Sequence, residues 1–197
     1  MSLCHDALLP CLQPLSHTRT NGLSDDGFSD SPAYIALSRQ LSAGFTCGGR
    51  AVSYRGLGEL DLSAHRAWDT AAANLLAQAH STEGVRFLTR SAERFLGKGA
   101  PGLQVAIPGG PASAWLSHPQ PFTILDRHVS GLLGERVGYL VPSQTILLAL
   151  PLSELDDLKW AKQASARTLV GEQLLSSPVT WTHGFPVEAP APMLTHP

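Results

Sequence analysis

Apolar residues recur along the chain in two patterns, one with the spacing of helices and the other with the spacing of strands. Across residues 63–80 they recur every three or four positions, which predicts an amphipathic helix. Residues 119–133 repeat this pattern. Gly134 is suited to end the second helix, because glycine adopts the left-handed conformation at little cost. We expect these two segments to be the principal helices.

Two further segments have shorter helical patterns. Residues 33–41 place three apolar side chains at helical spacing and predict a short amphipathic helix. A last helix is expected from Ser153 to about Val170, because Ser153 is followed three positions later by the acidic Asp156, as in a capping box. The chain is thus expected to form three to four helices.

Runs of β-branched and apolar residues predict the strands. The best hairpin candidate joins residues 137–141 to residues 145–150. The second of these runs is continuously apolar, so we expect a central strand that is covered on both faces. The other predicted strand segments are residues 45–54, with a break at Gly48 and Gly49, and residues 85–90, 103–107 and 179–183.

Helices and strands that follow one another without strict alternation, together with a tight hairpin, predict an α+β fold. We expect a largely antiparallel sheet of about five strands packed with three to four helices. Residues 1–31 are rich in Ser, Asp, Gly and Pro and are interpreted as a flexible leader. Residues 32–188 then form a single domain, and the proline-rich residues 189–197 form an extended tail.

Composition narrows the classes of function. Hydrophobic residues make up 43% of the 197 residues and charged residues 15%, which is enough apolar material for a core without a disulfide or a metal. With a net charge of −2 and no dense basic cluster, the chain is not expected to bind nucleic acid. No apolar run is long enough to predict a membrane span. The three cysteines, an odd number, indicate reduced thiols and a cytoplasmic location.

Three parts of the chain carry a resemblance to a known family: residues 72–76, residues 114–116, and residues 137–143 with 145–148. In their order and intervals they resemble the uncharacterised bacterial protein family typified by YtpQ, over roughly residues 60–170. The resemblance implies a cytoplasmic α+β protein and carries over no active-site residues.

A serine hydrolase needs a hydroxyl, a histidine that activates it and a carboxylate that orients the histidine. Ser113 follows a glycine-rich turn after a predicted strand, and His118 or His128 would supply the base, with Asp126 as the acid. No Gly-x-Ser-x-Gly motif is present, so an ordinary strand-to-helix turn is the preferred interpretation.

Other candidate sites are weaker. Trp115 is the best candidate for an exposed binding aromatic, although core packing is the favoured interpretation. His65 and Asp69 stand four apart on a helix, where a polar surface is preferred over a pair of metal ligands. The cysteines and histidines of residues 4–17 fit no zinc spacing, and residues 97–102 lack the order of a phosphate-binding loop. We therefore expect no metal and no cofactor.

Two functional hypotheses follow. The first is a non-catalytic interaction or regulatory module, which binds a protein partner or associates with itself, because ionisable residues do not cluster in any motif. The alternative is a small hydrolase or transferase that uses Ser113, His118, Asp126 and His128. The two hypotheses differ in whether a serine hydroxyl and a histidine nitrogen meet in a pocket.

Overall fold

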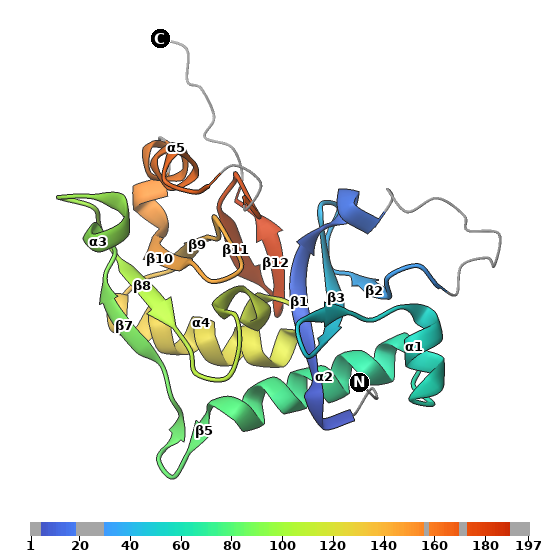
Figure 1. Cartoon of the computed structure of the whole chain (residues 1–197). Helices are drawn as coiled ribbons and strands as arrows, with labels where there is room; N and C mark the ends of the chain where they lie inside the picture. The colour runs from blue at the N-terminus through green and yellow to red at the C-terminus, as the bar shows by residue number, and fades with distance from the viewer. Residues whose placement is uncertain (1–4, 19–29, 156–157, 170–172, 190–197) are drawn as a thin grey trace.

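The computed structural model describes residues 5–18, 30–155, 158–169 and 173–189. In these residues two antiparallel sheets lie side by side, with helices packed against both of them (Figure 1). The fold is therefore α+β with antiparallel sheets, as the sequence predicts.

The larger sheet has six strands in the described part of the chain, in the spatial order β12-β11-β9-β10-β8-β7. Every neighbouring pair is antiparallel, and β9 and β10 form the predicted hairpin. The strands are β7 (Leu88–Ser91), β8 (Leu103–Ala106), β9 (Val137–Leu140), β10 (Leu147–Pro151), β11 (Val179–Thr182) and β12 (Phe185–Glu188).

The central strand β10 is covered on both faces, as its continuously apolar sequence predicts. Leu147 and Ala149 face the core that includes helix α4 (Pro119–Leu133). Leu148 and Leu150 face a second core, to which helices α3 (Glu93–Leu96) and α5 (Lys159–Ala166) contribute. The alternation follows from the two-residue period of a strand, which places successive side chains on opposite faces.

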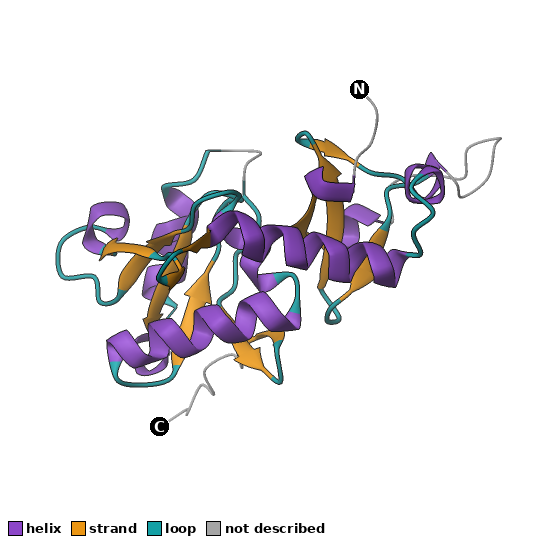
Figure 2. Cartoon of the chain, turned by 90° about the horizontal axis from the view of Figure 1, so that it is seen from below, coloured by secondary structure: helices purple, strands orange, loops and turns teal. Residues whose placement is uncertain are grey.

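The smaller sheet packs on the second long helix, α2 (Ala64–Ala79). Figure 2 views the chain from below, where α2 and α4 both lie in front of the sheets. Both helices match the predicted segments, and Gly134 ends α4 with a φ of 75°. The strands of this sheet are β1 (Leu8–Pro14), β2 (Tyr34–Ala36), β3 (Leu41–Cys47) and β4 (Arg50–Ala51).

The remaining elements are short. They connect the two sheets or flank the long helices, and none of the described helices is long and apolar enough to cross a membrane. These elements are α1 (Tyr54–Glu59), the β5 (His80–Ser81) and β6 (Gly84–Val85) hairpin, and the 3₁₀ helices η1 (His5–Ala7), η2 (Leu15–Thr18), η4 (Ala112–Leu116) and η5 (Leu152–Leu155).

The prediction of a flexible leader over residues 1–31 is wrong for its first part. Strand β1 pairs along its whole length with β3, and Leu8 and Leu12 are 0% exposed. Prolines are tolerated in β1 because it is an edge strand, where one row of backbone groups needs no partner. The composition of residues 1–31 is polar on average, so it does not reveal that Leu8 and Leu12 lie on one face of a strand. Residues 19–29 of the predicted leader and residues 190–197 of the predicted tail lie outside the described residues.

The helix predicted for residues 33–41 is also wrong. Residues 34–36 form β2, the backbone N–H groups of Leu37 and Ser38 donate to the Leu41 carbonyl, and Leu41 begins β3. The apolar spacing of this segment fits a helix as well as two strands joined by a turn. Pairing with β3, which local spacing does not reveal, decides the outcome.

The last predicted helix begins later than expected. Residues 152–155 form η5, and α5 starts only at Lys159 and ends at Ala166. The Ser153 hydroxyl donates to Glu135 at 3.2 Å instead of capping a helix, and Asp156 lies outside the described residues. The strand predicted for residues 85–90 is likewise divided between β6 and β7.

Candidate functional site

Ser113, the predicted nucleophile, is a structural residue in the interior of the molecule. It lies in η4 and is fully buried. Its hydroxyl donates to Gln144 Oε1 at 2.5 Å, and Gln144 Nε2 donates to the Leu12 carbonyl at 2.6 Å. The serine thus ties the loop before α4 to strand β1 through Gln144. Its hydroxyl makes no hydrogen bond to a described histidine.

His118 is the N-cap of α4. Its Nδ1 accepts the backbone N–H of Gln120 at 3.1 Å, and its Nε2 lies 3.3 Å from Asp69 Oδ1. Burial lowers the pKa of His118, and the Asp69 carboxylate opposes this shift. A neutral ring that accepts at Nδ1 carries its proton on Nε2, so Nε2 donates to Asp69. His118 therefore joins α4 to α2.

The two remaining candidates point to different surroundings. Asp126 accepts a hydrogen bond from the Tyr139 hydroxyl at 2.9 Å, whereas the exposed His128 stacks on Phe87 with ring centroids 4.6 Å apart. Residues two apart on a helix do not share a face. Each of the four candidates has a partner outside the set, so the structure does not assemble the arrangement that a serine hydrolase needs.

The prediction of Trp115 as an exposed binding aromatic is wrong, and the favoured interpretation as a core residue is correct. The side chain is 0% exposed and meets Phe87 edge to face at 5.3 Å. Its size and apolar rings make it one of the largest residues of the main core.

The weaker metal candidates are also placed by the structure. Asp69 pairs with His118, while the His65 ring lies beside Trp68, with centroids 6.4 Å apart. Among the residues that the structure describes, no group of three His, Cys, Asp or Glu side chains is placed to hold a metal ion. Cys4 lies outside those residues.

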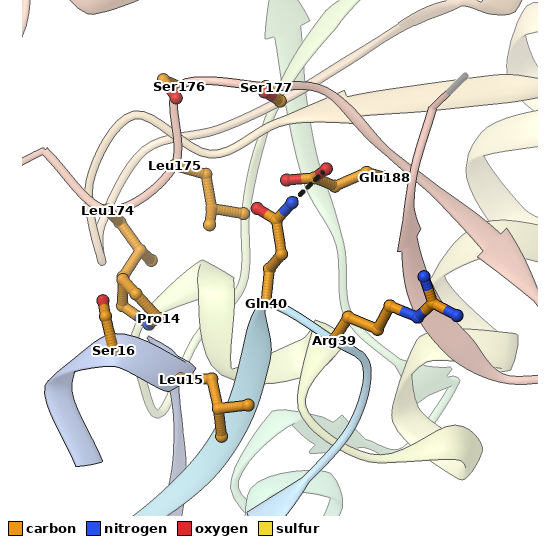
Figure 3. A pocket seen from close by; sticks show the side chains of 10 residues that line it. All are labelled: Pro14, Leu15, Ser16, Arg39, Gln40, Leu174, Leu175, Ser176, Ser177 and Glu188. Carbon is orange, nitrogen blue, oxygen red and sulfur yellow. Dashed lines mark hydrogen bonds between the residues drawn. The ribbon is translucent and has the colours of Figure 1, made fainter. Parts of the chain in front are cut away.

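The candidate site that the structure does build is a groove between the two sheets, which we call the inter-sheet groove (Figure 3). Its volume is about 320 Å³. Segments from the start, the first third and the end of the chain meet here. The lining residues are Pro14, Leu15, Ser16, Arg39, Gln40, Leu174, Leu175, Ser176, Ser177 and Glu188.

Backbone hydrogen bonds hold both walls of the groove. The Leu15 N–H donates to the Gln40 carbonyl at 2.6 Å, which fixes η2 against the turn between β2 and β3. On the other wall, the Leu174 and Leu175 N–H groups donate to the Pro142 and Val141 carbonyls at 2.8 and 3.0 Å. The groove is therefore preformed.

Of the two charged side chains that line the groove, only the acidic one has a side-chain partner among the described residues. Gln40 Nε2 reaches across and donates to Glu188 Oε2 at 2.8 Å, so the acidic group already has a partner (Figure 3). The Arg39 side chain extends away from this pair, and it forms no ion pair with a described residue. The inter-sheet groove thus has a cation on one side of Gln40 and the apolar side chains of Leu174 and Leu175 on the other side (Figure 3).

Sequence reasoning missed this groove entirely. Its first wall falls in the predicted leader, and Arg39 and Gln40 fall in the predicted helix. Gln40 and Glu188 are 148 positions apart, and neither belongs to a recognisable motif. The pairing of β1 with β3 forms one wall, and the packing of the two sheets brings it to the other wall, where Gln40 contacts Glu188.

No known protein family matches the chain, and searches of characterised proteins and of solved structures find no match. The resemblance of residues 60–170 to the family typified by YtpQ therefore stays a prediction.

Proposed function

We propose that this protein is a non-catalytic interaction module, and that its inter-sheet groove binds an extended, acidic peptide segment of a partner protein. The observation that carries the proposal is the unequal charge of the groove. Glu188 is held by Gln40, whereas Arg39 has no acidic partner among the described residues. A carboxylate on the peptide would supply that partner.

The apolar part of the groove supports an extended peptide. An extended chain directs alternate side chains to opposite sides, so that one carboxylate can face Arg39 while the neighbouring side chains meet Leu174, Leu175 and Leu15. The walls are held by backbone hydrogen bonds, so binding needs little ordering of the groove.

The alternative, a small hydrolase or transferase, has no observation in its favour. Ser113 is bonded to Gln144, His118 to Asp69 and Asp126 to Tyr139. A nucleophile that is fully buried would also have no access to substrate.

A cytoplasmic location forms part of the proposal. Cys11 and Cys47 are free thiols on neighbouring strands, but Cys11 faces Gly44 in the register and Cys47 faces Leu8. Three residues along a strand separate the two positions by roughly 10 Å, which is too far for a disulfide. Reduced cysteines are typical of a cytoplasmic protein.

The proposal is tested with an array of blocked six-residue peptides in which Val alternates with Glu, with Lys or with Ser. Binding to the isotopically labelled full chain is followed by amide chemical shifts. We expect the Val/Glu peptide to shift residues 15–16, 39–40 and 174–177, and the Val/Lys peptide to leave them unchanged. Arg39→Glu should weaken the Val/Glu peptide at least tenfold.

Arg50→Glu is the matched control, because Arg50 is exposed on β4 outside the groove and the charge change is the same. The proposal fails if the Val/Lys peptide binds as well as the Val/Glu peptide, or if both arginine variants weaken binding equally. Light scattering on the free chain tests a second copy as the occupant: a dimer that Arg39→Glu dissociates would also contradict the peptide proposal.

A further inference from the structure

A second pocket lies against β11 and the turn that follows it, and side chains from three separate segments line it. Its volume is about 270 Å³. Helix α4 contributes two side chains, β9 and the residue before it contribute one each, and β11 with the turn that follows it contributes four. The lining residues are Asp126, Ser130, Arg136, Val137, Thr180, Trp181, Thr182 and His183.

One end of the pocket carries a carboxylate that is partly withdrawn from water. Asp126 Oδ1 accepts the hydrogen bond from Tyr139, whose ring is fully buried in the core. No described residue donates to Oδ2. Burial raises the pKa of Asp126, while the Tyr139 hydrogen bond and the charge of Arg136 oppose this shift. The carboxylate therefore gains from any additional donor in the pocket.

The other groups of the pocket are basic or neutral. Arg136 is close enough to act on Asp126 through its charge but does not form an ion pair with it. His183 stands at the first position of the two-residue turn between β11 and β12, with a φ of 51°, and Gly184 follows with a φ of 90°. The pocket thus has one acidic and one basic side chain that do not form an ion pair with each other, so a ligand that carries both charges has a partner for each.

The lining of the pocket is also partly apolar, with Trp181 and Val137 among its residues. Trp181 Nε1 donates to Thr123 Oγ1 at 3.1 Å, which fixes the indole against α4. Val137, a second apolar lining residue, is buried. A short side chain can pack here while the charged ends of the same ligand face Asp126 and Arg136.

We propose that this pocket binds a small zwitterion of the α-amino acid class, with its ammonium group on Asp126 and its carboxylate on Arg136. The two charges of the ligand match the two charges of the pocket: the ammonium group would donate to Asp126 Oδ2, which accepts from no described residue, and the carboxylate would pair with Arg136. The volume suits a ligand with a short side chain. This inference rests on a different set of residues from the proposed function of the inter-sheet groove.

Binding is measured by calorimetry on the full chain with three amino acids, each compared with an analogue without the amine and one without the carboxylate. We expect at least one amino acid to bind at least tenfold more tightly than both of its analogues. The probes are glycine with acetate and methylamine, L-alanine with propanoate and ethylamine, and L-valine with 3-methylbutanoate and 2-methylpropylamine.

Two variants assign the ends of the ligand. Asp126→Asn keeps an acceptor for the Tyr139 hydroxyl, so the fold is retained, and it should abolish the preference for the amino acid over the carboxylate analogue. Arg136→Gln should abolish the preference over the amine analogue. Arg127→Gln, an exposed neighbour on α4, is the control and should change neither.

Three results would overturn the inference: no binding of any amino acid, equal binding of each amino acid and its analogues, or a preference that survives both variants. Chemical shifts locate the binding. Changes confined to residues 39–40 and 174–177 would place the ligand in the groove and would also contradict the inference.

Discussion

At the scale of single residues, buried polar atoms form hydrogen bonds with residues that are far away in the sequence. Gln144 links Ser113 of η4 to Leu12 of β1, and Trp68 Nε1 donates to the Ser117 carbonyl at 2.7 Å. A buried polar atom without a partner is costly, so such bonds specify which segments meet. Trp115 Nε1 is the exception, because it has no hydrogen-bond partner among the described residues.

Trp115 can be tested with two substitutions. Trp115→Ala should lower the free energy of unfolding by about 3–5 kcal/mol, because it leaves a large cavity. Trp115→Phe should cost only about 1–2 kcal/mol, because it fills most of the volume and removes the unpaired N–H. Chemical denaturation measures both values, and a loss for Trp115→Phe as large as that for Trp115→Ala would contradict this expectation.

His118 predicts a pH dependence of stability. Its pKa is lowered in the folded protein, so the unfolded chain binds the proton more tightly. The free energy of unfolding should therefore be fully retained above the unfolded pKa of about 6.5 and should decrease as the pH falls below it.

The variant His118→Asn isolates this effect, because asparagine is also a good N-cap. Its free energy of unfolding should fall less between pH 7 and pH 5 than that of the wild type. His128→Asn, a change at an exposed ring, should keep the wild-type slope. If both variants have the same slope, His118 is not the source of the pH dependence.

At the scale of secondary-structure elements, the larger sheet depends on close packing against both faces. Strand β9 passes under η5, where Gly138 lies against Leu155 with no room for a Cβ atom. The glycine is required by this contact and not by its backbone angles. A Cβ atom here would force the Leu155 side chain to move.

Gly138→Ala should destabilise the protein by about 1–3 kcal/mol, because Leu155 would have to move in a packed core. The matched control is Gly131→Ala in α4, where a Cβ atom meets nothing within 4 Å. That change should be neutral or should stabilise by up to about 1 kcal/mol, since alanine favours the helix. Thermal unfolding of the two variants compares them directly, and a neutral Gly138→Ala would contradict the described packing of η5.

At the scale of the whole molecule, the two sheets share one core. Leu12 of β1 and Leu41 of β3 belong to the same cluster as Leu75 of α2 and Tyr139 of β9. The β11–β12 hairpin also links the two candidate sites, because it contributes Glu188 to the inter-sheet groove and His183 to the Asp126 pocket.

Leu12→Ala should therefore destabilise both sheets together, by about 2–5 kcal/mol. We expect one unfolding transition, with the same midpoint in far-ultraviolet and near-ultraviolet circular dichroism. Leu88→Ala is the control, because Leu88 is 47% exposed and its loss should cost less than about 0.5 kcal/mol. Separate transitions for the two sheets, or a neutral Leu12→Ala, would contradict the shared core.

The sequence by itself determined the elements whose pattern is long and local: α2, α4 with its terminal Gly134, the β9–β10 hairpin and its apolar central strand. In these elements, residues that are close in the chain pack against one another or share one face. The periodicity of the apolar residues is therefore sufficient to predict them. The α+β class follows from their order.

Only the tertiary structure decided the pairing of β1 and β2 in the smaller sheet and the two candidate sites. Strands β1 and β2 exist because β3 supplies their hydrogen bonds, and proline-rich or ambiguous local patterns do not reveal that partner. Gln40 meets Glu188, and Asp126 meets Tyr139 and Arg136, through the packing of whole elements. A site formed by residues far apart in the chain has no local pattern, because its geometry arises only when the sheets and helices have packed.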